Sequence, residues 1–379
     1  MNGAIDRITI KGYKSIRNLD SFELGPVNVL IGANGAGKSN FVGFFRLLRS
    51  LVEQRLQMAT AIEGGADACL FLGPKITSEF SAEIDFGENR FGFALRPSFD
   101  NRFVFTSEDI WYQRPVEGWK KYSLRPSSSE SRLKDLKDSK GAAGRSSIHS
   151  FVYRAVSRWS VYHFDDTSAL AAVRRPHALN DDMYFRGDAS NLPAFLYRLR
   201  VTHRDHYERI RDAVRMAAPF FDDFTLRPVP TTPDLIQLEW LQKDSDYPFR
   251  VHQMSDGTLR FVCLATALLQ PEKPATMLFD EPELGLHPHA LGLLAALFRK
   301  ASSESQLIIS TQSASLLSEF APEDVVVVER SHGESTFRRL DALSLTEWLE
   351  DYSLGELWEK NILGGRPKQD RFPDPVFQR

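Results

Sequence analysis

A single glycine-rich stretch constrains the fold of this chain more than any other feature. Residues 32–39 have the sequence Gly-Ala-Asn-Gly-Ala-Gly-Lys-Ser, which fills every fixed position of a phosphate-binding P-loop. The short apolar and β-branched run 27–31 precedes it, and residues 40–51 carry apolar side chains at helical spacing. A true P-loop needs this order of strand, glycine loop and helix. We therefore expect an α/β protein built around a buried parallel sheet.

The residues of this loop have different expected roles. Gly35 and Gly37 let the backbone come close enough to the phosphates for its N–H groups to bind the anion. Lys38 is expected to reach the β- and γ-phosphates of ATP, and the hydroxyl of Ser39 is expected to hold Mg²⁺. The predicted nucleotide-binding residues are Asn34, Gly35, Ala36, Gly37, Lys38, Ser39 and Asn40.

An acidic pair ends a second apolar run far downstream. Residues 276–279 are Thr-Met-Leu-Phe, and Asp280 and Glu281 follow directly. Asp280 is expected to hold Mg²⁺ through water, and Glu281 to polarise the water that attacks the γ-phosphate. The alternative is an acidic pair that caps the segment beginning at Pro282. The P-loop upstream favours the catalytic interpretation.

A third motif, Ser255-Asp256-Gly257-Thr258, lies between the other two and precedes a predicted helix. We predict that Ser255, Gly257 and Thr258 face the γ-phosphate held by the P-loop of a second copy of the chain. The same residues are also of the types that cap a helix N-terminus, and capping is compatible with binding the γ-phosphate. The order of the three motifs resembles that of an ABC-type ATPase, in which two heads close face to face on two ATP molecules.

Two further residues are expected near the phosphates. Gln312 follows the apolar run 307–310, where ABC-type heads often carry a His that touches the γ-phosphate; a neutral amide can make the same hydrogen bond without titrating. The alternative is a polar residue at a strand end. His287 is expected at the dimer seam, where it either touches the partner's nucleotide or caps the helix that Pro288 opens.

Composition limits the location and the partners. Hydrophobic residues make up 42% of the chain and charged residues 26%, as in an ordinary globular protein. No apolar run approaches about 18 residues and the N-terminus lacks a signal-peptide core, so we expect a cytoplasmic protein with no membrane partner. The two cysteines lie in apolar contexts, which argues against disulfides and structural zinc.

Nucleic-acid binding receives little support from charge. The net charge is −3, so any contact with DNA would be a local patch. Six arginines on or near the predicted helix 192–218 are the candidates: Arg198, Arg200, Arg204, Arg209, Arg211 and Arg215. Acidic residues at positions 205, 208 and 212 interleave with them at spacings that suit intrahelical ion pairs, and this interpretation is favoured over a DNA-binding face.

The expected organisation is one two-lobed head that is split in sequence. Residues 1–115 would form the first lobe, residues 116–220 a loop and a mostly helical insertion, and residues 221–379 the second lobe. Within this plan we expect antiparallel strands over 80–112, a loop over 127–150, a helix over 192–218, a C-terminal hairpin, a helix over 343–362 and a polar tail from residue 364.

These motifs are similar to those of the RecF-like, ABC-type ATPases of the AAA family in bacteria, in particular the stand-alone ATPases of about this length. The matching stretches besides the P-loop are residues 161–168, 255–261, 280–288, 310–313 and 352–360. The resemblance implies an ABC/RecF/SMC-type head, Mg²⁺-dependent ATP hydrolysis, an ATP-bound homodimer and a role on DNA in repair or phage defence.

The resemblance leaves alternatives open. The OLD-type nucleases share this head but add a Toprim domain, and no Asp-x-Asp strand end follows Glu329, so we expect no intrinsic nuclease. A partner effector, a nuclease or a toxin, would then supply any cleavage. The alternative function is a nucleotide-gated scaffold that controls such an effector without binding DNA. A transporter ATPase is a third and weaker option.

Overall fold

A central, mainly parallel sheet organises the computed structural model, which describes residues 3–114, 118–124, 128–139, 147–164 and 166–365. Its strand order is β16-β15-β3-β14-β13-β8, and only β16 runs antiparallel to its neighbour. The strands are β3 (Val27–Ile31), β8 (Trp159–Tyr162), β13 (Thr276–Asp280), β14 (Gln306–Thr311), β15 (Val325–Ser331) and β16 (Glu334–Arg339). The predicted α/β class is thus confirmed.

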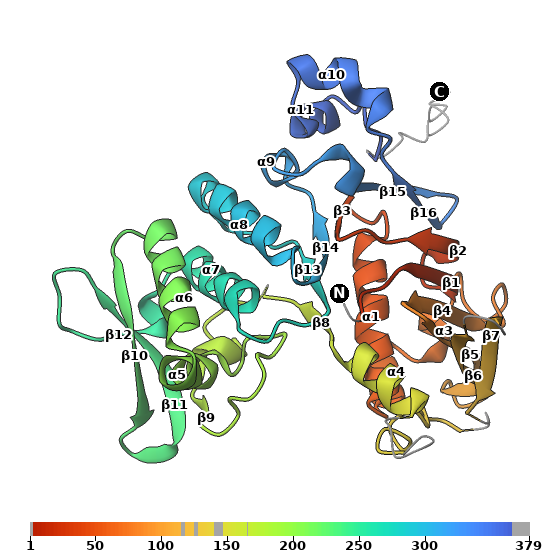
Figure 1. Cartoon of the computed structure of the whole chain (residues 1–379), viewed down its shortest axis with the longest axis horizontal. Coiled ribbons are helices and arrows are strands. Elements are labelled where there is room, and N and C mark those ends of the chain that lie inside the picture. Colours follow the sequence, from red (N-terminus) through yellow and green to blue (C-terminus); the bar gives the residue numbers. More distant parts are fainter. Residues whose placement is uncertain (1–2, 115–117, 125–127, 140–146, 165, 366–379) are drawn as a thin grey trace, which may run out of the picture.

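Every residue of β3, β13 and β14 is buried, because the sheet is covered on both faces. Neighbouring residues of a strand point to opposite faces, so they enter different cores. Leu30 and Leu278 contribute to one core, whereas Val29, Phe279 and Ile309 contribute to the other. Figure 1 shows further elements of the chain on either side of this sheet.

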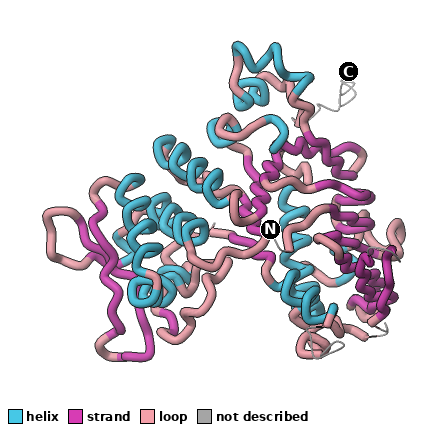
Figure 2. The backbone as a smooth tube through the Cα atoms, viewed as in Figure 1, coloured by secondary structure: helices cyan, strands magenta, loops and turns pink. Residues whose placement is uncertain are grey.

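One side of the central sheet holds an antiparallel sheet and the helices beside the P-loop. The strand order of this antiparallel sheet is β2-β1-β4-β5-β6-β7, and Figure 2 shows these strands gathered on one side of the molecule. The strands are β1 (Arg7–Tyr13), β2 (Ile16–Glu23), β4 (Phe80–Phe86), β5 (Asn89–Pro97), β6 (Phe103–Arg114) and β7 (Gly118–Ser123). The helices are α1 (Lys38–Val52), α2 (Leu56–Ile62), α3 (Ala66–Cys69) and α4 (Ile148–Ser157).

The other side of the central sheet is mainly helical and carries a small sheet, and it contains elements from both the expected insertion and the expected second lobe. Its helices are α5 (Leu192–Thr202), α6 (Arg204–Ala217), α7 (Asp256–Leu269) and α8 (Pro288–Ala301). The small sheet contains β9 (His177–Ala178), β10 (Phe221–Val229), β11 (Thr232–Gln242) and β12 (Phe249–Arg250). Three short helices complete the chain: α9 (Ala314–Leu317), α10 (Thr346–Asp351) and α11 (Leu354–Glu359). No helix within the described ranges combines the length and apolarity needed to span a bilayer.

Two predicted helices are each divided in the structure. The helix expected over 192–218 breaks at His203, whose backbone angles (φ −141°, ψ 60°) are not helical. The C-terminal helix expected over 343–362 becomes α10 and α11, because Tyr352 is extended and Ser353 begins a new helix. There the hydroxyl of Ser353 accepts from the N–H of Glu356, whose carboxylate caps Ser353 in return. These single-helix predictions were wrong in continuity.

The segment between the lobes differs from its expected form. β8 lies within residues 116–220, yet it pairs with β13 as the edge strand of the central sheet. In the expected loop 127–150, residues 128–139 form turns and α4 begins at Ile148, whereas 127 and 140–146 lie outside the described residues. Of the expected tail, residues 366–379 also lie outside them. The division of the chain into lobes and an insertion stays a prediction.

Aromatic packing holds the antiparallel sheet against α1. Phe80 is fully buried, and its ring centroid lies 4.9 Å from Tyr13 of β1 and 6.2 Å from Phe44 of α1. Further rings from β5 and β6, those of Phe93 and Phe103, lie 5.4 Å and 6.0 Å away. This cluster therefore links four strands, β1, β4, β5 and β6, to the helix that follows the P-loop.

We expect Phe80→Ala to lower the free energy of unfolding by about 3–5 kcal/mol, because it removes buried apolar area and leaves a cavity. Phe99→Ala is the matched control: its side chain is fully exposed, so the change should stay within about 0.5 kcal/mol. Urea denaturation followed by circular dichroism measures both. Equal losses for the two variants would contradict the assigned role of the cluster.

Candidate functional site

The predicted catalytic residues lie close together at the C-terminal ends of the parallel strands, which form one edge of the central sheet. Adjacent β3, β14, β13 and β8 are parallel, and their carboxyl ends lie side by side. The P-loop 32–39 follows β3, Gln312 follows β14, Asp280 and Glu281 lie at the end of β13, and His163 follows β8. Ligands of open α/β sheets bind beyond such ends. The sheet thus brings together residues that are far apart in the sequence.

The hydroxyls of Ser15 and Ser335 support the P-loop through hydrogen bonds on one side of it. Gly37 has a φ of +114°, and a Cβ there would overlap the Ser335 hydroxyl, so only glycine fits. Ser335 Oγ lies 2.7 Å from Ser15 Oγ and 2.5 Å from the carbonyl oxygen of Ala36. The amide of Asn40 donates to Ser15 Oγ at 2.6 Å. The structure thus places the Asn40 side chain beside these supporting hydroxyls.

The C-terminal segment also contacts the P-loop. The N–H of Ala33 donates to the carbonyl oxygen of Gly365 at 2.7 Å. The N–H of Gly365 donates in turn to Glu329 Oε1 of β15 at 3.0 Å. Residues from both ends of the described chain therefore fix the shape of the loop.

Lys38 is folded back into the loop. Its ammonium donates to the carbonyl oxygens of Gly32 at 2.6 Å and Ala33 at 3.2 Å, and the residue is only 3% exposed. Burial lowers the pKa of Lys38, because it disfavours the charged form. Three carboxylates act in the opposite direction, those of Glu281, Asp280 and Glu283. The site therefore holds a buried cation beside a group of acids.

The two acidic residues of the predicted pair have different environments. Asp280 is 8% exposed, and its Oδ2 accepts from Arg46 of α1 at 3.4 Å. Glu281 has a φ of +44°, a conformation that costs a non-glycine residue about 1–3 kcal/mol. Its N–H donates to the Ser310 carbonyl at 2.8 Å, and its Oε1 accepts from the Gln312 amide. The structure therefore brings Gln312 into direct contact with Glu281.

Sequence reasoning missed two residues of this edge. Glu283 Oε1 accepts from the Thr311 hydroxyl at 2.6 Å and from the N–H of Gln312 at 2.9 Å, so it fixes the end of β14. Burial raises its pKa, and within the described chain its Oε2 is buried without a partner. Arg46 also lies 3.4 Å from His163 Nδ1. The Asp-Glu-Pro-Glu pattern was a signal for Glu283; Arg46 had none.

The third motif has the geometry of a helix N-terminus. Ser255 caps α7, and its Oγ accepts from the N–H of Thr258 at 3.2 Å. A Cβ at Gly257 would overlap the carbonyl of Gly285, so the helix start touches the loop that follows Glu281. A hollow of about 110 Å³ opens beside these residues and His287. Its described lining contains no P-loop residue, so the two motifs form separate surfaces.

His287 caps α8, as one of the two interpretations expected. Its Nδ1 accepts from the N–H of His289 at 3.2 Å. Because it also lines the hollow beside Ser255 and Gly257, a contact with a partner's nucleotide stays a prediction.

The basic residues of α6 are largely engaged in ion pairs. Arg204 pairs with Glu208, Arg209 with Asp205, and Arg215 with Asp212 along the same helix. The favoured interpretation, a helix with internal ion pairs, is therefore confirmed for these three arginines.

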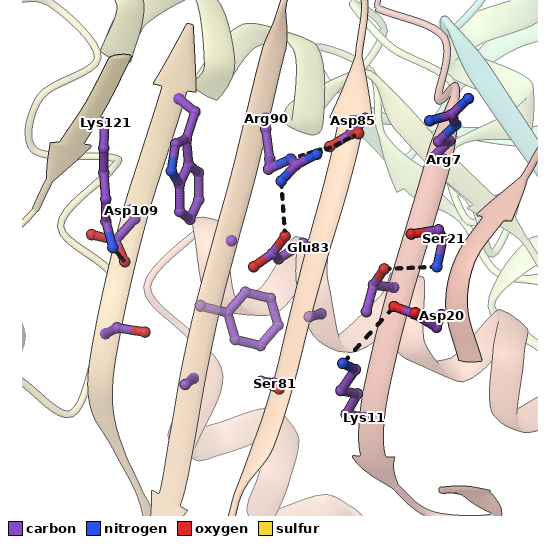
Figure 3. A pocket seen from close by; sticks show the side chains of 17 residues that line it. Arg7, Lys11, Asp20, Ser21, Ser81, Glu83, Asp85, Arg90, Asp109 and Lys121 are labelled. Atoms are coloured by element: carbon purple, nitrogen blue, oxygen red, sulfur yellow. Dashed lines mark hydrogen bonds and ion pairs between the residues drawn. The ribbon is translucent and has the colours of Figure 1, made fainter. Parts of the chain in front are cut away.

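A larger hollow, of about 350 Å³, lies over the outer face of the antiparallel sheet (Figure 3). Its charges pair across neighbouring strands: Lys11 with Asp20, Arg90 with Asp85 and Glu83, and Lys121 with Asp109. Because each of these cations faces a carboxylate, this face does not resemble a phosphate-binding patch.

Comparison with known proteins agrees with this geometry. A family model described as "AAA domain, putative AbiEii toxin, Type IV TA system" matches residues 27–318, which is more than half of the chain. No curated protein matches. Among solved structures, an SMC head bound to the C-winged helix domain of ScpA is 16% identical, with a TM-score of 0.59 over 91% of this chain and 99% of that chain.

Two further SMC heads are similar in fold. One, from Pyrococcus furiosus and bound to the C-terminal domain of ScpA, is 15% identical with a TM-score of 0.54. The other, from Pyrococcus yayanosii with a coiled coil and joint, is 12% identical with a TM-score of 0.52. Each match covers 92% of this chain and 99% of the other. The chain therefore belongs to the AAA-domain family of that description and has the α/β P-loop fold of ABC-type SMC heads.

Proposed function

We propose that the chain binds Mg²⁺–ATP at its P-loop and hydrolyses it as a head-to-head homodimer. Family membership supports ATP binding and hydrolysis. The observation that carries the proposal is the meeting of Lys38, Asp280, Glu281 and Gln312 at one sheet edge, with the contact between Glu281 and Gln312 already formed. This arrangement combines a cation for phosphate with a carboxylate for water.

Lys38 and the P-loop backbone would hold the phosphates. In this structure the ammonium satisfies itself on two loop carbonyls, and phosphate oxygens would take their place as stronger, charged acceptors. The N–H groups at the start of α1 point along the helix toward the same place, where a negative charge is stabilised.

The site contains oxygen donors that suit Mg²⁺. Ser39 offers a hydroxyl in the first turn of α1, and Asp280 offers a carboxylate at the end of β13. Hard oxygen ligands of this kind, together with phosphate and water, are what Mg²⁺ prefers. When bound, the ion would neutralise charge that develops on the phosphates.

Glu281 is the residue that would orient the attacking water. The amide of Gln312 holds one carboxylate oxygen, which leaves the other to accept a hydrogen bond from water. Glu283 fixes the backbone from which Gln312 projects, so the order of contacts runs from Glu283 through Gln312 to Glu281. A contact of Gln312 with the γ-phosphate remains compatible, because an amide has two N–H groups.

Ser255, Gly257 and Thr258 would complete the site of a partner subunit. They form the N-terminus of a 14-residue helix and line a hollow separate from the P-loop of their own chain. A helix of this length presents a partial positive charge at its start. We therefore assign them to the γ-phosphate of a second copy, which makes a closed dimer necessary for hydrolysis.

The biological role proposed is action on DNA in repair or phage defence. The alternative is a nucleotide-gated switch for an effector protein. The paired arginines of α6 and the paired sheet face lend no support to direct DNA binding. A protein partner is supported by analogy alone: two of the similar SMC heads are bound to domains of ScpA.

Lys38→Ala is expected to abolish tight ATP binding, because it removes the charged donor that phosphate requires. Isothermal titration with ATP and Mg²⁺ measures this. Lys75→Ala, at an exposed lysine, is the control and should bind as the unaltered protein does. Retained affinity in Lys38→Ala would refute the assigned role.

Glu281→Gln is expected to lower turnover by about 10²–10⁴-fold while ATP still binds, because the variant loses the group that activates water. An ATP-bound dimer should therefore accumulate and be visible by light scattering. Glu304→Gln changes an exposed carboxylate in the same way and should leave turnover intact. A monomer that persists in ATP–Mg²⁺ would count against head-to-head closure.

Turnover with and without linear double-stranded DNA, at two salt concentrations, separates the two roles. Stimulation that fades as salt rises would support action on DNA, because phosphate contacts release counterions. ATP turnover that DNA does not change at either salt concentration would support the effector-switch alternative.

A further inference from the structure

Two arginines are buried in the half of the molecule that carries the Ser255 motif. Arg174 is 5% exposed and Arg260 is 7% exposed. Arginine is almost never buried to this degree unless its five N–H groups have partners, because the cost of removing its charge from water is high. The partners of these two residues therefore show which parts of the chain they hold together.

Arg174 connects three segments around the start of α7. Its Nε donates to the carbonyl oxygen of Thr167 at 2.7 Å, and its Nη1 donates to that of Val251 at 2.5 Å. Nη2 donates to Asp256 Oδ1 at 2.6 Å, and both terminal nitrogens lie 3.3 Å from the Met254 carbonyl. These contacts fix the backbone immediately before Ser255 and the first residue of the helix after it.

Arg260 connects α7 to the edge of the central sheet where Asp280 and Glu281 lie. It lies on α7 five positions after Ser255, and its Nε donates to the carbonyl oxygen of Phe164 at 2.9 Å. Its Nη1 donates to the carbonyl of Leu284, in the loop that follows Glu281. Phe164 directly follows His163, which contacts Arg46 beside Asp280. Arg260 thus joins the helix to the segments that follow the two neighbouring strands β8 and β13.

The close approach of Gly257 to Gly285 strengthens this connection. A Cβ at Gly257 would overlap the Gly285 carbonyl, so the start of α7 rests directly on the loop after Glu281. A packed contact of this kind transmits displacement, because interiors yield little to compression. The segment proposed to face the partner therefore packs directly against the segment that follows the proposed water-activating Glu281.

We propose that Arg174 and Arg260 are positioning residues that couple the two nucleotide sites of the closed dimer. Arg174 sets the turn that Ser255 and Gly257 offer to the partner's ATP. Arg260 ties that turn to the loop of its own Glu281, so the state of one site reaches the other. This inference rests on the head-to-head dimer proposed above.

Lysine cannot replace arginine in these positions. Its ammonium is a single point donor, whereas the planar guanidinium reaches several carbonyl oxygens and a carboxylate at once. Arg→Lys therefore keeps the charge but disconnects some of the segments. A displacement of about 1 Å at a reacting centre can lower the rate by about 100-fold.

Dimers of two different variant chains test the proposal, because each arginine substitution can be placed in one chain or in the other. Chain X carries Glu281→Gln, so it binds ATP and lends its Ser255 motif but does not hydrolyse. Chain Y carries Ser255→Ala, so it hydrolyses only with the motif of X. The two full-length chains are mixed before ATP is added, and the ATP turnover and KM of the mixture are compared with those of each chain alone.

The effect of each variant should depend on the chain in which it is placed. Arg174→Lys in X should lower kcat of the mixture by about 10–100-fold without raising KM, because the P-loop belongs to Y. The same change in Y should leave turnover unchanged, since the motif of Y is already silent. Arg260→Lys should lower kcat from either chain. Arg204→Lys in X, a surface ion-pair change, is the matched control and should have no effect.

A second variant protects the test against misfolding. The Asp256 side chain is 66% exposed, so Asp256→Asn weakens its contact with Arg174 without disturbing the core. Asp256→Asn should lower kcat of the mixture when chain X carries it and not when chain Y does, and the decrease should be smaller than that for Arg174→Lys. Thermal unfolding and ATP binding are measured for each variant, and both should match those of the parent chain.

The outcomes separate this inference from the function on which it rests. If X and Y without any arginine change hydrolyse no more ATP as a mixture than they do separately, the proposed head-to-head site is contradicted. If the mixture is active but Arg174→Lys has the same effect in X and in Y, or none in X, the coupling role is overturned. For Arg174, a purely structural role would lower turnover whichever chain carried the change. For Arg260, it would lower turnover together with thermal stability or ATP binding, both of which should stay unchanged if the residue couples the two sites.

Discussion

The parallel pairing of β3, β14, β13 and β8 is the constraint on which the rest of the structure depends. Parallel strands bring their carboxyl ends to a single edge, and this edge collects a lysine, two acids and an amide from distant parts of the chain. The same pairing requires both faces to be covered, which accounts for the two cores. Fold and site therefore have one physical origin.

The candidate catalytic residues are held in place by hydrogen bonds between buried and half-buried polar groups. Glu283 fixes Gln312, and Gln312 fixes Glu281, whose backbone is strained. Such strain persists only where the surrounding structure over-determines it. The buried arginines of the opposite half extend the same order toward the surface that would meet a second subunit. In the proposed dimer, each chain would contribute one segment to its own nucleotide site and another to its partner's, and these arginines connect the two segments.

Much of this was available from residue patterns. The P-loop, the Asp280–Glu281 strand end and the capping role of Ser255 depend on short segments, and local chemistry determines short segments well. The predicted continuous helices failed at His203 and at Tyr352, where the chain turns to pack against other elements. At Tyr352 the following helix begins with its own capping box, formed by Ser353 and Glu356, and its Leu354 and Leu357 enter the core.

The sequence by itself determined the α/β class, the nucleotide loop and the identities of the acids that accompany it, because these follow from spacing and side-chain chemistry. Tertiary structure alone decided that β8 joins the central sheet, that Glu283 and Arg46 belong to the catalytic edge, and that Arg174 and Arg260 hold the start of α7. The reason is physical. Many of these hydrogen bonds end on backbone carbonyls, which every residue possesses, so only the folded chain shows which ones a side chain can reach.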